Sequence, residues 1–278
     1  MSSTAVQPEI FEKLGKIALI GGGKMGEAIV AGLVHGALLN PEAIEIAEPG
    51  EDRRATLEST YGVSCSASGE DILGAQTAIF AVKPQVFKQV AAQLSAAEGF
   101  APQRVISIAA GVTTNTIAEF FPAASVVRVM PNTPLMASAG MSVVAVAEGT
   151  PIAEGELVVE LFSIMGEALL IPEDQINAAT AISGSGPAYF ALFVEELTRA
   201  GTTIGLSEEQ AQHMALQTLI GTARQLQLTD ESPEELRIAV TSPGGTTQAA
   251  LESFSQNGLG NIIEKAVRAA NQRAQELA

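Results

Sequence analysis

The feature that most constrains the fold is a glycine-rich turn in the segment IALIGGGKMGEAIV at 17–30, between an apolar run and a helical pattern. Gly21, Gly23 and Gly26 have the spacing G-x-G-x-x-G. The first glycine permits a tight bend, the second lets the backbone approach a pyrophosphate, and the third lets a helix pack closely on a strand. Glu48 follows at about the 20-residue distance at which a carboxylate meets the ribose. The segment therefore predicts a dinucleotide-binding turn, with an ordinary tight turn as the alternative.

The rest of the first half alternates short apolar runs with helical patterns. We expect strands at 16–20, 43–47, 63–65, 77–82, 105–109, 125–130, 140–147 and 168–171, with helices between most of them. This alternation predicts βαβ units and an α/β fold with a doubly wound parallel sheet. Ligands of such sheets bind beyond the carboxyl ends of the strands. We therefore expect Gly21–Gly26, Glu48, Ala81–Pro84 and Ala109–Gly111 to converge on one crevice.

Beyond Pro172 the strand pattern is replaced by helical periodicity. We expect helices at 188–203, 208–228, 234–240, 246–254 and 259–277, with capping boxes at Ser207/Gln210 and Ser232/Glu235. The sequence thus predicts a nucleotide-binding domain at 1–172 and an all-α domain at 173–278. Apolar residues lie on more than one face of these helices, which indicates burial against a second copy of the chain.

Composition excludes several classes of function. The formal net charge of −16 argues against a nucleic-acid partner. Cys65 is the one cysteine, so an intrachain disulfide and a cysteine-based metal cluster are excluded and a reducing cytoplasm is indicated. His35 and His213 lack metal-ligand spacing, so no metal is expected. We predict no signal peptide, and no membrane span, because proline, glycine or asparagine interrupts the long uncharged stretches 129–147 and 176–194.

Two loops in the second half are unusual. Ser183–Pro187 reads SGSGP and Thr241–Thr247 reads TSPGGTT, and each precedes a helical pattern. Free backbone N–H groups, a positive helix end and small hydroxyls at such a position form a carboxylate-binding arrangement. From spacing alone, two helix caps joined by turns remain the alternative.

Six motifs together resemble pyrroline-5-carboxylate reductase. They are the glycine turn, AVKPQ at 81–85, AAGV at 109–112, RVMPNTP at 128–134, SGSGPAY at 183–189 and TSPGGTT at 241–247. The resemblance covers nearly the whole chain in the same order. It implies reduction of the imine 1-pyrroline-5-carboxylate to L-proline with NADPH or NADH. It also implies a Rossmann domain followed by a helical dimerisation domain, and a homodimer that can assemble further into a pentamer of dimers.

The resemblance also implies a set of site residues. Thr247 is the implied catalytic residue, hydrogen-bonded to the imine nitrogen. The implied substrate-binding residues are Glu173, Ser242, Gly244, Gly245, Thr246 and Thr247. The implied cofactor-binding residues are Ile20, Gly21, Gly22, Gly23, Lys24, Met25 and Gly26 at the pyrophosphate, Glu48 and Ser68 near the adenine ribose, Ala81, Val82, Lys83 and Pro84 in a second loop, and Ala109, Ala110 and Gly111 beneath the nicotinamide.

The residues near the ribose leave the choice of cofactor open. Glu48 stands where several members of this family have a small hydroxyl residue, and Ser68 stands where some have asparagine. A carboxylate at position 48 favours NADH, because it accepts a hydrogen bond from the ribose 2′-hydroxyl and repels a 2′-phosphate. Arg53 and Arg54 are close enough in sequence to hold that phosphate instead.

Two other functions remain open at this point. A β-hydroxyacid or ketopantoate-type dehydrogenase would share this architecture, but those enzymes use a catalytic lysine in the helical domain. From Asp174 onward the chain has only Lys265, well beyond both glycine loops. A non-catalytic NAD(P)-sensing module would bind the dinucleotide without oxidising it.

Overall fold

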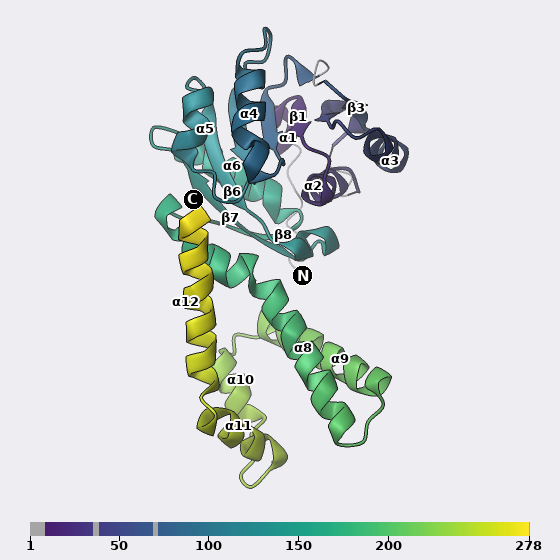
Figure 1. The fold of residues 1–278 in the computed structure, drawn as a ribbon, viewed down its shortest axis with the longest axis vertical. Coiled ribbons are helices and arrows are strands. Elements are labelled where there is room, and N and C mark those ends of the chain that lie inside the picture. Colours follow the sequence, from purple (N-terminus) through teal and green to yellow (C-terminus); the bar gives the residue numbers. More distant parts are fainter. Residues whose placement is uncertain (1–8, 36–38, 69–71, 278) are drawn as a thin grey trace. The chain divides into compact units, whose positions relative to one another are not determined.

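The computed structural model describes residues 9–35, 39–68 and 72–277 and divides into two units, which are drawn in Figure 1. One unit comprises Met1–Ser185 with Ala270–Ala278, and the other comprises Gly186–Ala269. The boundary expected from the sequence lies earlier, at residue 172. Within the described ranges, no helix is long and apolar enough to cross a membrane.

The first unit is built on an eight-stranded sheet with the order β3-β2-β1-β4-β5-β6-β7-β8. Its strands are β1 Ile17–Ile20, β2 Ile44–Ala47, β3 Ser64–Ser66, β4 Thr77–Phe80, β5 Arg104–Ser107, β6 Ser125–Met130, β7 Gly140–Val146 and β8 Gly166–Leu170. Neighbouring strands are parallel except β6 and β7, which are antiparallel. The sheet is therefore mainly parallel, as expected, and departs from that expectation only at this pair. The link between β6 and β7 holds only the 3-10 helix η3 (Thr133–Ala137) and is too short for a crossover.

Helices cover both faces of this sheet (Figure 1). One face packs against α1 Glu9–Leu14, α2 Lys24–His35, α3 Glu51–Tyr61 and α6 Ile152–Ser163; the other packs against α4 Pro84–Ser95 and α5 Thr114–Phe120. Side chains alternate between the faces, so Ile17 and Leu19 of β1 enter the first core and Ala18 and Ile20 enter the second. Burial on both faces explains why β1 and β4 are continuous apolar runs in the sequence.

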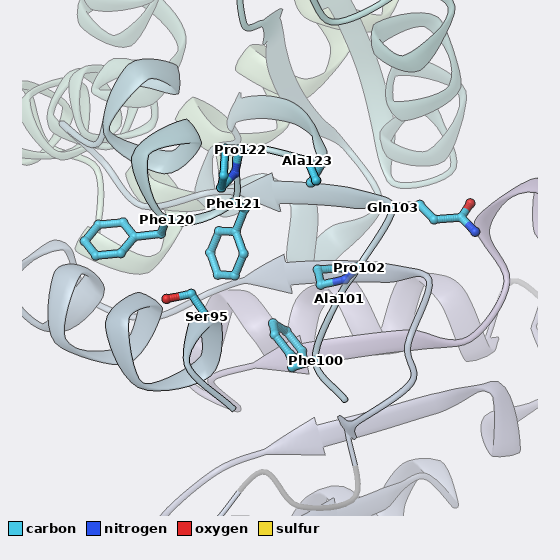
Figure 2. Close-up of a pocket in the computed structure, with 10 residues that line it drawn as sticks. Ser95, Phe100, Ala101, Pro102, Gln103, Phe120, Phe121, Pro122 and Ala123 are labelled. Atoms are coloured by element: carbon cyan, nitrogen blue, oxygen red, sulfur yellow. The ribbon is translucent and has the colours of Figure 1, made fainter. Parts of the chain in front are cut away.

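A shallow pocket of about 290 Å³ opens beside β5 and β6 (Figure 2). Figure 2 shows the rings of Phe100, Phe120 and Phe121 in its wall. The lining residues are Ser95, Phe100, Ala101, Pro102, Gln103, Phe120, Phe121, Pro122, Ala123 and Ala124. Most of them directly precede β5 and β6, so the pocket lies at the amino ends of the strands. It has no charged lining residue and lacks the convergent polar groups typical of a ligand site.

The second half of the chain is helical, as expected. Its elements are η4 Glu173–Gln175, α7 Ile176–Ala179, α8 Gly186–Thr203, α9 Glu208–Leu228, α10 Pro233–Ala239, α11 Thr246–Gln256 and α12 Leu259–Leu277. Both predicted capping boxes form, at the first residues of α9 and α10. A Cβ atom on Gly201 would lie 2.8 Å from the Cβ of Ala211, so this glycine permits the close packing of α8 on α9.

The prediction of a loop at Ser183–Pro187 is wrong. Residues Thr180–Gly184 form a π-helix that joins α7 to α8, and the N–H of Ser185 donates to the carbonyl of Thr180 at 2.9 Å. The Ser183 hydroxyl donates to the carbonyl of Ala179 at 3.0 Å. The N–H of Ser185 is therefore bonded within the helix, and the segment does not present the expected open helix end. One of the helices expected between strands should begin at 68–71, and residues 69–71 of that start lie outside the described residues.

Candidate active site

The glycine turn leads from β1 into α2 at the carboxyl edge of the sheet. Gly21 has φ = +103°, which glycine adopts without strain. Its N–H donates to the carbonyl of Ala47 at the end of β2, at 2.9 Å. A Cβ on Gly21 would lie 2.8 Å from the carbonyl oxygen of Ala81, just beyond β4. Gly21 is therefore held between the ends of the two strands that flank β1.

Gly26 has no room for a side chain, whereas Gly23 faces open space. A Cβ on Gly26 would lie 2.2 Å from the carbonyl oxygen of Gly21, so the glycine permits α2 to pack on the turn. A Cβ on Gly23 would meet no atom within 4 Å. Helix α2 begins at Lys24, directly after this open position. The space beside Gly23 and the N–H groups of the first helical turn fit the pyrophosphate of a dinucleotide.

The other predicted cofactor loops lie along the same edge. Backbone hydrogen bonds join Ala81 to Ile20 at 2.8 Å and Ile108 to Phe80 at 3.0 Å, so β1, β4 and β5 end side by side. The loop Ala81–Pro84 leads into α4, with Lys83 as its N-cap and Pro84 as its first residue. The loop Ala109–Gly111 forms a turn closed by Val112, with Gly111 at φ = +76°. The strand ends therefore form one continuous edge.

Glu48 is fixed at this edge by backbone donors. Its Oε2 atom accepts the N–H of Gly22 at 2.9 Å, and its Oε1 atom accepts the N–H of Gly50 at 2.8 Å. Its own N–H donates to the carbonyl of Ser66 at 2.9 Å. Ser68 is exposed and follows β3, which neighbours β2, so it lies beyond the same end of the sheet.

The two arginines of α3 already donate hydrogen bonds to other groups of the protein. Arg53 donates through Nη2 to the Glu27 carboxylate at 2.6 Å and through Nε to the carbonyl of Gly22. Arg54 donates through Nη1 to the carbonyls of Glu48 and Pro49, at 3.0 and 2.8 Å. The suggested clamp for a 2′-phosphate is therefore not preformed: both guanidinium groups hold the protein together.

Glu27 has a second donor in Tyr61. The phenol oxygen of Tyr61 lies 3.2 Å from Oε1 of Glu27. Burial, and then the negative charge of Glu27, raise the pKa of Tyr61, so the phenol stays protonated and continues to donate. The sequence offers no signal for this cluster, because its members are joined only by the fold.

Glu173 lies in a network that sequence reasoning missed. Its Oε1 atom accepts the N–H of Thr114 at 2.7 Å and Nη1 of Arg128 at 3.1 Å. The Thr114 hydroxyl donates to Oε2. Arg128 is buried in β6, with a side chain 5% exposed, and Thr114 is the first residue of α5 after the Ala109–Gly111 loop. The network therefore fixes the start of α5, and a substrate group would have to share this carboxylate.

The substitution Glu173→Gln is expected to destabilise the fold. It removes the counter-charge of buried Arg128 and weakens two bonds to Thr114, which costs about 1–3 kcal/mol for a partly exposed carboxylate. Differential scanning calorimetry measures the loss. Glu167→Gln, at an exposed position of strand β8, is the control and should change stability by less than about 0.5 kcal/mol. Unchanged stability with a raised KM for the substrate would instead place Glu173 in direct substrate contact.

The loop before α11 contains a tight turn at Ser242–Gly245. The N–H of Gly245 donates to the carbonyl of Ser242 at 3.0 Å, and Gly244 has φ = +72°. Proline at the second position and a positive φ at the third are typical of a type II turn. The N–H of Gly244 donates to Oε1 of Gln248 at 2.7 Å, which holds the turn against the helix.

Helix α11 begins at this turn without a side-chain cap. Gly245 is the N-cap and forms no side-chain capping bond, so the N–H groups of Thr246 and Thr247 point out of the first turn. Thr247 is half-buried, and its hydroxyl has no hydrogen-bond partner among the described residues. Ser242 and Thr246 are exposed. An uncapped helix end with hydroxyls beside it is suited to an anion.

The remaining candidate nucleophile is not activated. Burial raises the pKa of the Cys65 thiol to about 11, so it is protonated at neutral pH. His213 is exposed on α9. The chemistry of this chain is therefore better sought at the glycine turn and at the start of α11.

Two known protein families match this chain, one in each of the two halves expected from the sequence. Residues 16–111 match a family described as NADP oxidoreductase, coenzyme F420-dependent, and residues 173–277 match the family described as pyrroline-5-carboxylate reductase dimerisation. A pyrroline-5-carboxylate reductase from Synechocystis is 41% identical to this chain, over 94% of this chain and 98% of that relative. The chain belongs to the pyrroline-5-carboxylate reductase family. The reductase of Pseudomonas aeruginosa is 38% identical, over 95% of this chain and 97% of its own length.

Solved structures of pyrroline-5-carboxylate reductases share the fold. The one from Coxiella burnetii is 34% identical, covers 95% of this chain and 99% of its own, and superposes with a TM-score of 0.87. The Plasmodium falciparum enzyme, solved with NADP bound, is 28% identical, covers 95% of this chain and 98% of its own, and has a TM-score of 0.80. As a member of this family, the chain is an NAD(P)H-dependent oxidoreductase.

The dimerisation match coincides with exposed apolar side chains. Within α8, α9 and α12 these include Phe190, Leu192, Phe193, Met214, Leu216, Ile220, Ile262 and Ile263. Apolar surface of this extent marks a protein–protein interface. The helical half of this reductase therefore forms a homo-oligomer, as the sequence predicts.

Proposed function

We propose that this chain reduces 1-pyrroline-5-carboxylate to L-proline with NAD(P)H, the last step in making proline. The observation that carries the proposal is the uncapped start of α11 beside Thr246 and Thr247 in a chain of this family. It supplies a recognition site for the substrate carboxylate, while the open glycine turn supplies one for the dinucleotide.

The dinucleotide is assigned to the carboxyl edge of the sheet. The pyrophosphate belongs at the turn from Ile20 to Gly26, with Lys24 and Met25 in the first helical turn. The adenine ribose belongs near Glu48 and Ser68, and the nicotinamide end belongs along Ala81–Pro84 and Ala109–Gly111. When bound, the cofactor supplies a hydride equivalent to the imine carbon.

The substrate carboxylate is assigned to the turn before α11. The N–H groups of Thr246 and Thr247 and the Ser242 hydroxyl donate to it, and the positive end of the helix favours its charge. Gly244 and Gly245 contribute by shaping the turn, because the Gly244 N–H is taken by Gln248. Glu173 is also assigned to the substrate. Its carboxylate would then bind the substrate while it still accepts hydrogen bonds from Thr114 and Arg128.

Thr247 is assigned to the imine nitrogen. A threonine hydroxyl is a weak acid, so its role is to hydrogen-bond and orient that nitrogen while it gains a proton. Most of the rate then comes from holding the substrate in a fixed orientation, with water excluded.

The proposal also includes the number of subunits in the oligomer and a location in the cytoplasm. The exposed apolar side chains of α8, α9 and α12 are assigned to the contacts of a homodimer, and the family resemblance extends this assembly to a pentamer of dimers. A reducing cytoplasm suits a chain whose one cysteine is free.

The proposal is tested by following the absorbance of NADH and of NADPH with the purified chain and 1-pyrroline-5-carboxylate. Imine-dependent loss of absorbance, with L-proline as product, is expected. Ketopantoate and β-keto acids are the controls and should give no turnover. Turnover of the keto acids alone would identify a different dehydrogenase, and binding of dinucleotide without oxidation would identify a sensing module.

A further inference from the structure

We propose that this chain selects NADH over NADPH and that Glu48 is the residue that selects. The inference rests on the proposed function, because it concerns the dinucleotide of the same reaction. It follows from three properties of the edge formed by β2, β3 and the glycine turn: the chemistry of the Glu48 carboxylate, how firmly it is held, and the engagement of the nearby cations.

The carboxylate of Glu48 can only accept hydrogen bonds when ionised. It has about four acceptor positions, and the N–H groups of Gly22 and Gly50 use two of them. The vacant positions suit a ligand that donates, such as the 2′- and 3′-hydroxyls of an unmodified ribose. A 2′-phosphate only accepts and carries negative charge, so it would meet a like charge with no proton between them.

The position of this carboxylate is fixed by its neighbours. Both of its oxygens are bonded to backbone N–H groups on different segments, and the main chain of Glu48 is bonded to Ser66 and to Arg54. Turning the side chain away to admit a phosphate would break two hydrogen bonds of 2.8 and 2.9 Å. The repulsion is therefore built into the turn that holds the cofactor.

The cations of this region are committed elsewhere. In residues 39–68 the sequence has two basic side chains, Arg53 and Arg54. Arg53 is bound to Glu27 and the carbonyl of Gly22, and Arg54 is bound to the carbonyls of Glu48 and Pro49. Binding a 2′-phosphate through Nε or Nη2 of Arg53 would break its bond to the Gly22 carbonyl or its ion pair with Glu27. Lys24, in the first turn of α2, lies at the pyrophosphate position.

The test is equilibrium binding, measured by the fluorescence of NADH and NADPH titrated against the purified full chain without imine. We expect the wild-type protein to bind NADH about 10- to 100-fold more tightly than NADPH. Glu48→Ser removes the charge and should reduce this ratio to near one or reverse it. Glu51→Gln removes an equal charge from the exposed first turn of α3 and should leave the ratio within about twofold.

Each outcome bears on one claim. If wild-type protein binds NADPH as tightly as NADH, the inference is overturned, whatever the behaviour of the variants. If Glu48→Ser is folded by circular dichroism and keeps the wild-type ratio, Glu48 is not the selecting residue. A chain that prefers NADH but fails to oxidise it with the imine refutes the proposed function and leaves this inference standing. Turnover of the imine with a preference for NADPH would support the proposed function and refute this inference.

Discussion

Alanine at Gly26 should lower the stability of the fold and weaken dinucleotide binding, whereas alanine at Gly23 should weaken binding alone. The added Cβ at Gly26 would lie 2.2 Å from the carbonyl oxygen of Gly21, which is backbone and cannot rotate away. Overpacking of this kind costs about 1–3 kcal/mol and should lower the melting temperature by about 3–10 °C. The Cβ at Gly23 meets no protein atom within 4 Å, so it would occupy only space assigned to the pyrophosphate.

The two substitutions form a matched pair, since each adds one methyl group to the same turn. Scanning fluorimetry without ligand measures stability, and NADH fluorescence titration measures affinity. Gly23→Ala is expected to keep the wild-type melting temperature within about 1–2 °C and to weaken binding about 10- to 100-fold. Wild-type affinity in a folded Gly23→Ala protein would remove the pyrophosphate from this turn.

Thr247→Ala should reduce kcat/KM for the imine about 100-fold, the size of effect found when one positioned donor is removed from a reacting group. The Thr247 hydroxyl has no partner among the described residues, so its loss leaves no protein group unsatisfied. Stability should therefore change little, and the Kd for NADH should stay at its wild-type value. Steady-state kinetics and fluorescence titration measure the two quantities.

Thr247→Ser is the control for this substitution, because it keeps the hydroxyl and removes only a methyl group. It should retain most of the wild-type kcat/KM. Equal losses in the serine and alanine variants would show that the methyl group matters and the hydroxyl does not. Loss of NADH affinity in Thr247→Ala would indicate a binding role instead of a role in orienting the imine.

The sequence predicted the elements well where one pattern decided them. Apolar runs such as TAIF at β4 are buried on both faces, and the bounds of α9 follow from a capping box at Ser207 and a long amphipathic pattern. The glycine turn was also predictable, because Gly21 has a positive φ and Gly26 packs against the carbonyl of Gly21, while Gly23 leaves open space between them. The loop expected at 241–247 directly before a helix is also present, with a turn at Ser242–Gly245 and α11 beginning at Thr246.

The failures have a different physical origin. Glycine and serine at 183–186 are typical of a loop, yet Ser183 and Gly184 end a π-helix and Gly186 begins α8. A contact distant in sequence supports this conformation, because Asn132 Nδ2 donates to the carbonyl of Ser183 at 3.0 Å. The Arg128–Glu173–Thr114 network joins residues far apart in the chain, so no local sequence spacing predicts it. The antiparallel β7 was the one error that link length alone could have prevented.

The central claim is that this chain transfers hydride from a nicotinamide to the imine carbon of 1-pyrroline-5-carboxylate. It is tested most directly with NADH stereospecifically deuterated at C4, used in separate reactions as each of its two C4 isomers, with the proline analysed by mass spectrometry and NMR. One isomer is expected to give L-proline with a single deuterium at C5, formed in step with NADH oxidation. Proline without deuterium from both isomers, or oxidation of NADH with no proline formed, would contradict it.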